Sequence, residues 1–526
     1  MTSKRIHLQH TLLLLVHRHL LRRICMSCLI FKPRTAFIYG NNWLCQSPFP
    51  QYCFTSCQIL FETTLFHVTY KDIPLISSIA SIFQSEVKSV FLFDSRAFDV
   101  EDCSAYTGII SGLKTRLENL NDLDFLNKSS PVFFPHLTEL DVEVHPPLFL
   151  SFANALKDNS SITRLFLWNN SIDCQGAAAL AEVLKVNSVV SMINLWDNSI
   201  GDAGTTAFSE ALKINSTIKL IDLGFNYIGP DGAIALAEAL KLNSSITNVI
   251  LDDNSIGDEG TTVLAESLKV NSTVTQLSLS KNSIDFKGAE ALANTLIENV
   301  SLRVIGLSNN QIRNEGAISL AESLKVNSVI TQINVSENSI GTEGAMALAE
   351  AFKVNSTITS VDISGNSIGV EGTTAIAEAL KVNSTISTIN LGNCSIQAKG
   401  ALALAEMLKS NTSLTKINLG HNSIDVEGVL AVAQALKVNS TVIDLVLDGN
   451  SIGDDGLLAL VEALKINSSI SEIHLEENSI RNESAIALAE VLKIHSSITK
   501  VYLWSNSVGF KTQQLIKIVS TGRIVC

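Results

Sequence analysis

The sequence predicts an α/β solenoid, an array of 28-residue strand–loop–helix units stacked in chain order. The first observation behind this prediction is an asparagine that recurs every 28 residues with no insertion or deletion, one position being filled by cysteine instead. The second is a change in apolar spacing within a unit, from the alternation of a strand to the three- and four-residue spacing of a helix. The recurring positions are Asn170, Asn198, Asn226, Asn254, Asn282, Asn310, Asn338, Asn366, Cys394, Asn422, Asn450, Asn478 and Asn506.

The unit from Ser245 to Ser272 illustrates the pattern. Val249 and Leu251 alternate with other residues, as expected of a short strand with one buried face. Turn-forming and acidic residues follow, and acidic side chains are favourable at a helix N-terminus. Leu264 and Leu268 then lie one helical turn apart, and a lysine and an asparagine close the helix. Each unit is therefore expected to run strand, loop, helix, loop.

The recurring asparagine is predicted to have a structural role. Where each strand turns toward its helix, backbone N–H and C=O groups lose their ladder partners, and one side-chain amide can satisfy several of them. Removing such an amide leaves buried groups unpaired, which costs ~1–3 kcal/mol for each. A thiol does the same work weakly, so we expect a mild local defect at Cys394.

The consensus L-x-L-x-x-N-x-I-G-x-x-G-x-x-A-L-A-E-A-L-K-x-N resembles the leucine-rich repeat of the ribonuclease-inhibitor class. That repeat also occurs in NLR-type CARD-containing immune sensors and in Ran GTPase-activating proteins. Thirteen units follow it, from about Ser161 to Ser520. The resemblance implies a horseshoe with parallel strands on its concave side and helices on its convex side. It also implies that the concave side is the usual contact face, although proteins with this repeat have different functions.

Four segments are expected along the chain. They are a basic and disordered N-terminal tail at 1–61, degenerate capping repeats at 62–160, thirteen regular repeats at 161–520, and the C-terminal end at 521–526. Capping is indicated because residues 137–142 mimic the strand pattern of the first regular unit, and the terminal units of solenoids are commonly atypical. A small separate α/β domain is the alternative for residues 62–160. Residues 510–519 are expected to form a last short helix.

The N-terminal tail differs from the rest of the chain in charge. It holds seven Lys or Arg and no acid before Glu62, and because the whole chain carries −13, the remainder carries −20. An unstructured tail is the favoured interpretation, and a mitochondrial targeting segment or a membrane-surface arm is the alternative. The longest apolar run near the N-terminus, Leu12 to Val16, is far shorter than the ~20 residues of a spanning helix. No transmembrane segment is therefore expected.

The cysteines indicate a reducing compartment. Five of the nine lie in the tail and the others are scattered, which is not a disulfide framework. A cytoplasmic location is predicted, with mitochondrial targeting as the alternative. The pairs Cys25–Cys28 and Cys53–Cys57 have spacing like that of zinc ligands but lack the turn residues of zinc knuckles, so no zinc site is expected there.

Asn-x-Ser/Thr triplets recur at one phase of the repeat, the helix-to-strand turn. Glycosylation is one interpretation of such triplets. Because Asn, Ser and Thr are turn formers in their own right, we interpret them instead as structural. They begin at Asn215, Asn243, Asn271, Asn355, Asn383, Asn439 and Asn467, among other positions.

No pattern of catalytic or cofactor-binding residues stands out. The sequence has no G-x-x-x-x-G-K-[ST] phosphate loop, and His421 and His474 have no serine or cysteine set beside them in a triad pattern. We therefore expect no enzyme activity, no cofactor and no metal. The acidic array without a basic stripe also disfavours nucleic acid as a partner.

A binding function is sought on the concave strand positions that the core does not dictate. Aromatic and acidic residues gather there toward both ends of the array, whereas the middle units present small neutral residues. Aromatic residues are common binding anchors, and acidic residues steer basic partners. The candidate partner-binding residues are Phe166, Trp168, Trp196, Asp197, Phe225, Asp252, Asp253, Asp444, Asp448, Glu472, His474, Glu476, Tyr502 and Trp504.

The leading hypothesis is a non-catalytic scaffold that binds a basic protein or peptide on this acidic and aromatic face. The resemblance leaves two alternatives. One is a GTPase-activating protein of the Ran-activator type, but that family follows its repeats with a strongly acidic tail, whereas Lys511 to Cys526 is slightly basic. An assay of GTP hydrolysis by Ran separates it from the scaffold. The other is a ribonuclease inhibitor, whose alternating repeat lengths and many cysteines are not found here.

Overall fold

The computed structural model describes residues 91–93, 112–117, 126, 137–520 and 522–525. The chain divides into two compact units, residues 1–166 and residues 167–526. The expectations for the N-terminal tail, including its cysteine pairs and its targeting alternatives, lie outside the described residues.

The described strands of the first unit run parallel to one another. They are β1 (Phe91–Phe93), β2 (Gly112–Leu117), β3 (Glu139–Val144) and β4 (Arg164–Phe166), and each pairs with the next. After β3, two prolines begin the short 3-10 turn η5 (Pro146–Leu148), because proline fits the first turn of a helix. The helix α4 (Phe149–Lys157) follows and buries Phe152 and Leu156.

The second unit contains one short strand in each repeat. Neighbouring strands are parallel, and in the regular repeats they pair residues that lie 28 positions apart, as Ile333 pairs with Val361. Equivalent residues of successive repeats are therefore direct neighbours on the sheet. The strands are β5 (Met192–Asn194), β6 (Leu220–Asp222), β7 (Asn248–Ile250), β8 (Gln276–Ser278), β9 (Val304–Gly306), β10 (Gln332–Asn334), β11 (Ser360–Asp362), β12 (Thr388–Asn390), β13 (Lys416–Asn418), β14 (Asp444–Val446), β15 (Glu472–His474), β16 (Lys500–Tyr502) and β17 (Ile524–Val525).

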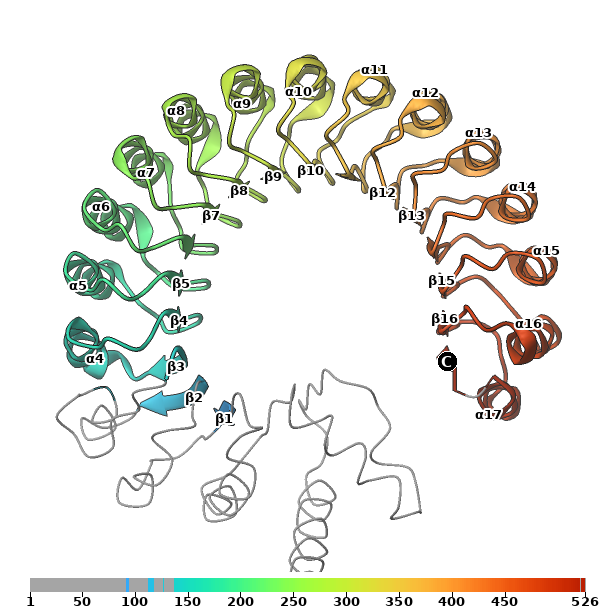
Figure 1. Ribbon diagram of the computed structural model, residues 1–526, viewed down its shortest axis with the longest axis horizontal. Coiled ribbons are helices and arrows are strands. Elements are labelled where there is room, and N and C mark those ends of the chain that lie inside the picture. The colour runs from blue at the N-terminus through green and yellow to red at the C-terminus, as the bar shows by residue number, and fades with distance from the viewer. Residues whose placement is uncertain (1–90, 94–111, 118–125, 127–136, 521, 526) are drawn as a thin grey trace, which may run out of the picture. The chain divides into compact units, whose positions relative to one another are not determined.

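Helices alternate with these strands and lie along the outer side of the curved second unit, while the strands line its inner side (Figure 1). This arrangement confirms the predicted solenoid with concave strands and convex helices. The helices are α5 (Cys174–Leu184), α6 (Gly201–Leu212), α7 (Pro230–Leu242), α8 (Gly257–Val270), α9 (Phe286–Glu298), α10 (Arg313–Val326), α11 (Thr342–Val354), α12 (Gly369–Val382), α13 (Gln397–Leu408), α14 (Asp425–Leu436), α15 (Gly453–Leu464), α16 (Asn482–Ile494) and α17 (Phe510–Val519).

The core of each repeat lies between the strand and the inner face of the helix. Leu277 on β8 and Leu292 on α9 are each 1 % exposed. A glycine in the first turn of most helices lets successive repeats approach closely: a Cβ atom at Gly260 would lie 2.9 Å from the Cβ of Ala233 on the preceding helix. Glycine is needed at that position because any larger side chain would push the two repeats apart.

The recurring asparagines stack behind the ends of the strands. Asn310 is representative: its Nδ2 donates to Leu279 O and to Leu307 O, each at 3.0 Å. Its Oδ1 accepts from the backbone N–H of Asn282 at 2.9 Å and of Ile284 at 3.0 Å. One amide thus serves backbone groups of two consecutive repeats, so an insertion between repeats would move it out of reach of three of these four partners.

Cys394 occupies one position of this asparagine stack and is fully buried. Its backbone N–H donates to Asn422 Oδ1 at 2.7 Å, and its thiol donates to Ile363 O at 3.4 Å. A thiol lacks the carbonyl oxygen that accepts two backbone N–H groups elsewhere in the stack. Burial raises the pKa of the Cys394 thiol to about 12, so this cysteine stays protonated and chemically inert.

A second row of buried asparagines runs along the helix-to-strand turns. Asn271 is representative: its Nδ2 donates to Leu240 O at 2.7 Å and to Asn243 O at 3.0 Å, and its Oδ1 accepts from the N–H of Thr273 and of Val274. Nδ2 is the atom that a glycan would modify, and here it is engaged inside the array. The structural interpretation of the Asn-x-Ser/Thr triplets agrees with this geometry. In the second unit the row comprises Asn187, Asn215, Asn243, Asn271, Asn299, Asn327, Asn355, Asn383, Asn411, Asn439 and Asn467.

Arg523 takes the place of an asparagine in this second row. It follows His495 by 28 residues, and His495 itself stands where the preceding repeats have asparagine. The Arg523 guanidinium donates to His495 O at 2.6 Å, to Ile498 O at 3.1 Å and also to Leu492 O. A guanidinium group with several N–H donors therefore satisfies carbonyl groups that a side-chain amide satisfies in the earlier repeats.

Candidate interaction surface

The candidate residues at the start of the array are aromatic. Phe166 ends β4 in the first unit, where the Arg164 guanidinium lies 5.5 Å from its ring centroid. In the second unit Trp168 is 44 % exposed, whereas Trp196 is half-buried because its ring lies against Gly224. A Cβ atom at position 224 would fall 2.1 Å from Trp196 Cε3, so only glycine fits beneath the ring. Trp168 is thus the more accessible of the two tryptophans.

A pair of aromatic rings follows in the next repeat. Asp197 and Phe225 occupy equivalent loop positions with left-handed backbone, at φ 57° and 52°. The rings of Phe225 and Tyr227 lie 6.0 Å apart, and both side chains are exposed. Tyr227 was not predicted from the sequence, although its position directly after the buried Asn226 marks it as a loop residue.

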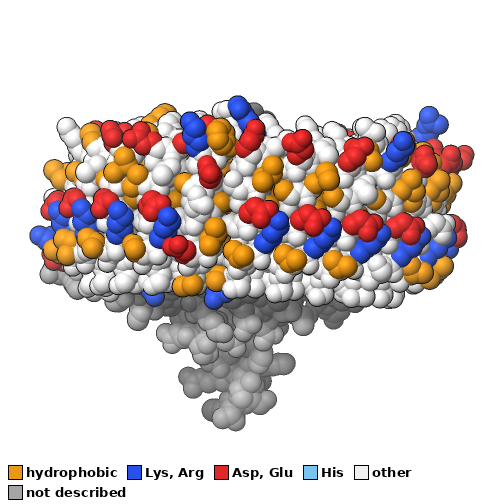
Figure 2. All heavy atoms as spheres, turned by 90° about the horizontal axis from the view of Figure 1, so that it is seen from above, with side chains coloured by type: hydrophobic (Ala, Val, Ile, Leu, Met, Phe, Trp, Pro, Cys, Tyr) orange, Lys and Arg blue, Asp and Glu red, His pale blue; other side chains and the backbone are white. Residues whose placement is uncertain are grey.

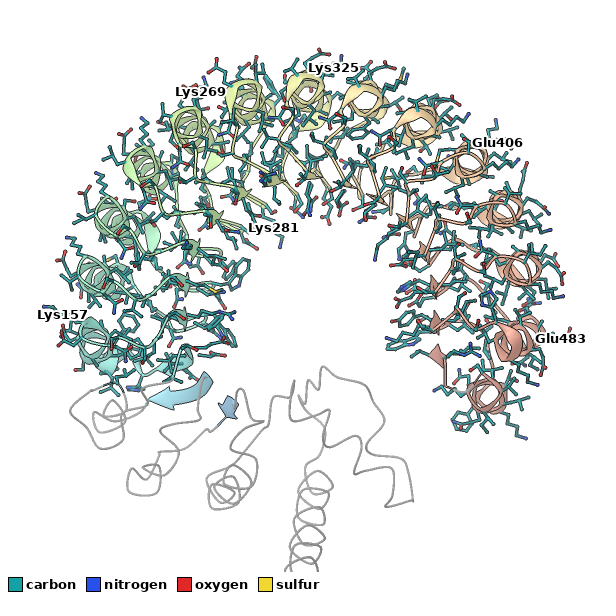
Figure 3. The ribbon with its side chains drawn as sticks, in the orientation of Figure 1. Lys157, Lys269, Lys281, Lys325, Glu406 and Glu483 are labelled. Atoms are coloured by element: carbon teal, nitrogen blue, oxygen red, sulfur yellow. The ribbon has the colours of Figure 1, made fainter. Side chains whose placement is uncertain are left out.

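The acids at 252 and 253 are engaged by neighbouring repeats. Asp252 Oδ1 accepts from the Ser278 hydroxyl at 2.6 Å and from the Ser280 N–H at 2.7 Å. Asp253 Oδ2 lies 3.2 Å from Lys281 Nζ, and Lys281 points toward the inner side of the arc (Figure 3). The acidic character of this part of the face is therefore reduced by a lysine that sequence reasoning did not consider.

Asp222 is an inner-surface acid that sequence reasoning missed. It ends β6 and is 8 % exposed, its Oδ2 accepting from Asn194 Nδ2 at 3.0 Å and its Oδ1 from the Gly224 N–H at 3.0 Å. Burial raises the pKa of this carboxyl to about 6, a rise that the Gly224 N–H opposes and the nearby Asp252 charge reinforces.

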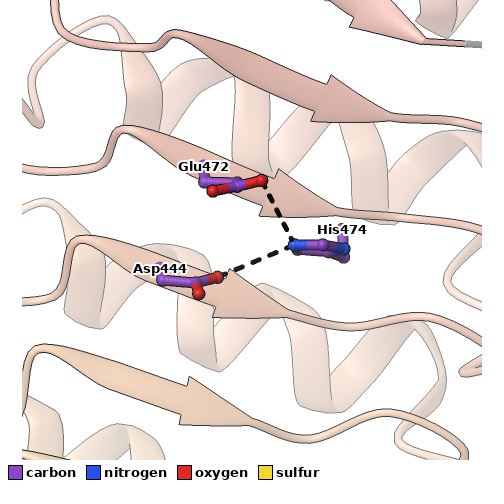
Figure 4. Close-up of side chains that lie close together, drawn as sticks. All are labelled: Asp444, Glu472 and His474. Atoms are coloured by element: carbon purple, nitrogen blue, oxygen red, sulfur yellow. Dashed lines mark ion pairs between the residues drawn. The ribbon is translucent and has the colours of Figure 1, made fainter. Parts of the chain in front are cut away.

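Toward the C-terminal end, five candidates come together on the adjacent strands β14, β15 and β16 and the loop after β15. Figure 4 shows three of them, Asp444, Glu472 and His474. His474 Nε2 lies 3.8 Å from Asp444 Oδ1 and 3.8 Å from Glu472 Oε1, and its Nδ1 lies 3.8 Å from Glu476 Oε1. The Tyr502 ring stacks on the imidazole with centroids 4.3 Å apart, and its hydroxyl donates to Glu472 Oε1 at 2.8 Å. We call these five residues the C-terminal cluster.

Two lysines that sequence reasoning missed flank the C-terminal cluster. Lys416 Nζ lies 2.6 Å from Asp444 Oδ2, and Lys500 Nζ lies 5.1 Å from the centroid of the Tyr502 ring. The signal was present in the sequence, because Lys416, Asp444, Glu472 and Lys500 are successive members of one 28-residue column. Within that column the two lysines lie on either side of the two acids.

The charges of the C-terminal cluster support one another. The Glu476 carboxylate raises the pKa of His474 above its usual value, burial opposes this rise, and Asp444 and Glu472 add to it. Burial by itself would raise the pKa of Glu476, but His474 and backbone N–H groups outweigh burial and lower it. The imidazole is therefore held in a ring of carboxylates that favours a positive charge at its position.

Asp448 and Trp504 occupy the positions 28 residues before and after Glu476. Asp448 Oδ2 lies 3.0 Å from His421 Nε2, and the His421 ring covers Gly449, which has a left-handed backbone with φ 61°. Trp504 is 53 % exposed. His421 therefore has one carboxylate neighbour in this ion pair, whereas His474 has three.

The outer side of the second unit is chemically different. Most helices carry a lysine that pairs with a glutamate three residues earlier, as Lys269 Nζ does with Glu266 Oε1 at 2.6 Å. Figure 2 shows these paired charges as a band, with hydrophobic side chains in a row beside it. Exposed aliphatic residues recur at the helix ends, including Val186, Ile214, Leu242, Val270, Val326, Val354, Val382, Val438 and Ile466. The outer side is thus uniform from repeat to repeat, whereas the inner side varies.

Comparison with known proteins agrees with this architecture. Eight segments match a family model described as Leucine Rich repeat, at 215–237, 270–293, 298–321, 326–349, 354–377, 382–405, 410–433 and 438–461. These segments are leucine-rich repeats. The second unit is accordingly a leucine-rich-repeat solenoid, a fold whose usual role is to bind proteins without catalysis. None of the described helices is long and apolar enough to cross a membrane.

No curated protein matches the chain, whereas 157 chains among solved structures do. One of them is Leiomodin-1 Actin-Binding Site 2 (ABS2), which is 22 % identical. The match covers 29 % of this chain and 88 % of that one, with a TM-score of 0.26.

Proposed function

We propose that this leucine-rich-repeat protein is a non-catalytic scaffold that binds a protein or peptide along its concave face. The observation that carries the proposal is the contrast between its two sides. Exposed Trp168, Phe225 and Trp504 and the C-terminal cluster all lie on strands or on the loops that follow them, whereas the outer side repeats the same residues. A surface on which residues differ from repeat to repeat can be specific for one partner.

The aromatic residues support a role as anchors. A tryptophan has a large apolar area and few rotatable bonds, so burying it against a partner is favourable and costs little side-chain conformational entropy. The asparagine stack holds the backbone beneath these side chains in place before any partner arrives. Such pre-organisation lowers the entropic cost of association.

The charge of the concave face supports a partner with basic groups, but less strongly than a count of acids implies. Asp253 and Asp444 already pair with Lys281 and Lys416. Glu477 is an exposed acid beside Trp504, because its backbone N–H donates to Trp504 O at 3.2 Å. We therefore propose a partner that presents an apolar group together with a basic one, and not a uniformly basic segment.

The repeat length and the strand–helix content of each repeat support the ribonuclease-inhibitor class of leucine-rich repeat. The inert, buried Cys394 and the scattered cysteines support a cytoplasmic location. No observation on the concave face specifically favours the Ran-activator or ribonuclease-inhibitor alternative.

The test compares two double variants of the full chain against a partner identified by cross-linking and mass spectrometry. Trp168→Ala with Trp504→Ala removes two exposed concave anchors, and Ile214→Ala with Val270→Ala removes two outer side chains that are more exposed still. We expect the concave variant to raise the dissociation constant at least tenfold, in line with ~2 kcal/mol or more for buried anchors, and the outer variant to leave it unchanged. Equal affinity of the concave variant and the wild type would refute the concave assignment.

A further inference from the structure

We propose that the C-terminal cluster is a binding site for one divalent transition-metal ion, with Zn²⁺ the best match, held by His474 Nε2, Asp444 and Glu472. The inference goes beyond the scaffold function and does not depend on it. One ligand comes from β14 and two come from β15, so two neighbouring repeats supply the site.

The ligand atoms already converge. One donor atom from each of Asp444, Glu472 and His474 lies within 4.8 Å of the others, and the imidazole nitrogen is 3.8 Å from both carboxylate oxygens (Figure 4). Zn²⁺ binds nitrogen and oxygen at ~2.0–2.2 Å, which places tetrahedral ligands ~3.4 Å apart. The imidazole nitrogen therefore needs to approach each carboxylate oxygen by about 0.4 Å, and the two carboxylate oxygens, which lie within 4.8 Å of each other, need to approach by up to about 1.4 Å. Rotations about the side-chain bonds provide such movements.

A second observation concerns the hydrogen bonds of Asp444. Its Oδ2 receives Lys416 Nζ at 2.6 Å, but among the described residues its Oδ1 is shielded from solvent without a hydrogen-bond partner. Buried carboxylate oxygens are nearly always satisfied, and one that is not indicates a missing ion or water. This oxygen is also the one that lies 3.8 Å from His474 Nε2. An ion between them would satisfy it.

A third observation is the support around the ligands. Glu476 faces His474 Nδ1, the nitrogen that does not face the other carboxylates. A carboxylate on one imidazole nitrogen fixes the proton there and leaves the lone pair of the other nitrogen for a metal, an arrangement common in metal sites. Tyr502 stacks on the imidazole and donates to Glu472, which holds both ligands in position.

The donor set selects among metals. One imidazole and two carboxylates suit Zn²⁺ and related transition metals, whereas Mg²⁺ and Ca²⁺ prefer oxygen ligands alone.

The test measures bound Zn²⁺ in the full chain by equilibrium dialysis and elemental analysis. His474→Ala should bind one Zn²⁺ fewer per chain than the wild type, and His421→Ala, which alters the other concave histidine, should bind the same number. Because cysteine thiolates are common zinc ligands in general, the difference between variants is decisive and the total is not. If His474→Ala binds as much Zn²⁺ as the wild type, the proposal is overturned.

A milder variant guards against a folding defect. Asp444→Asn preserves shape, and it should weaken the site by tenfold or more while circular dichroism remains that of the wild type. Co²⁺ serves as a spectroscopic probe. Bound at this site in the wild type, it should give d–d absorption without a thiolate-to-metal charge-transfer band. Both variants should lose this d–d absorption. Unchanged Zn²⁺ affinity in folded Asp444→Asn, or an equal response to Mg²⁺, would also reject the site.

Discussion

Three aspartates on neighbouring strands and loops show how strongly local contacts govern a side chain. Asp222 is buried between Asn194 and Gly224, Asp252 accepts two hydrogen bonds from the next repeat, and Asp253 pairs with Lys281. All are inner-surface residues that the sequence presents as similar acids. Their different neighbours, and not their type, decide which remain available to a partner.

The raised pKa of Asp222 predicts a pH-dependent stability. Its value in the folded protein, about 6, lies above the ordinary 3.8, so folding favours the protonated form. The stabilisation is therefore complete below about pH 4 and is lost as pH rises through 6. The free energy of unfolding of the wild type should therefore fall by up to about 3 kcal/mol between pH 4 and pH 8, relative to that of Asp222→Asn, which cannot ionise. Urea unfolding at several pH values measures this difference, and parallel curves for the two proteins would contradict it.

At the scale of secondary-structure elements, two rows of buried amides determine how one repeat joins the next. The first row ties the strand ends together, and the second ties each helix C-terminus to the following strand. The departures from asparagine are informative because each replacement has its own hydrogen-bonding capacity. Cys394 supplies a weak donor, and Arg523 supplies several strong ones.

Cys394→Asn should stabilise the array by about 1–2 kcal/mol, because the added carbonyl can accept the N–H groups of Asn366 and Ile368 as Asn310 does for its own neighbours. The reverse change in a regular repeat, Asn310→Cys, should destabilise by at least as much. Thermal or urea unfolding of both variants tests the pair. A loss of stability in Cys394→Asn would mean that the pocket has adapted to sulfur.

Arg523→Ala should loosen the end of the solenoid. The carbonyls of His495 and Ile498 lose a charged donor, at ~1–3 kcal/mol for each buried group left unpaired. Amide exchange followed by mass spectrometry should accelerate in α16 and α17. Arg481→Ala, which alters an exposed arginine, serves as the control and should leave exchange in α17 unchanged. Protection equal to that of the wild type would show that the arginine contacts contribute little.

At the scale of the whole second unit, each repeat contacts mainly its neighbours in the chain, so stability is a sum of repeat and interface contributions. Asn338→Ala in the middle of the array should therefore act locally. We expect faster amide hydrogen exchange from β9 to β11 and unchanged exchange around β15, because the hydrogen bonds of the Asn338 side-chain amide reach only adjacent repeats. Uniformly faster exchange would indicate that the array unfolds as one cooperative body.

Much of the architecture could be predicted because a fixed period leaves few alternatives. The 28-residue spacing of Asn170 to Asn506 specifies the register between strands, and the change in apolar spacing specifies which segment is strand and which is helix. The last helix, α17, begins and ends at the predicted residues. The charge pairing of Lys281 with Asp253 and of Lys416 with Asp444 was not predicted, although each lysine lies 28 residues from its partner, because side-chain rotation decides whether neighbouring charges meet.

The sequence by itself determined the repeat, the solenoid and the surface on which residues vary, because hydrophobic burial and amide hydrogen bonding both follow the period. Only the tertiary structure decided what the variable residues do together. Whether Trp196 is exposed depends on its packing against Gly224, and whether His474 can share an ion with Asp444 depends on side-chain rotation across two strands. Such contacts depend on side-chain positions that differ by a few ångströms, and the spacing of residues in the sequence does not specify positions that finely.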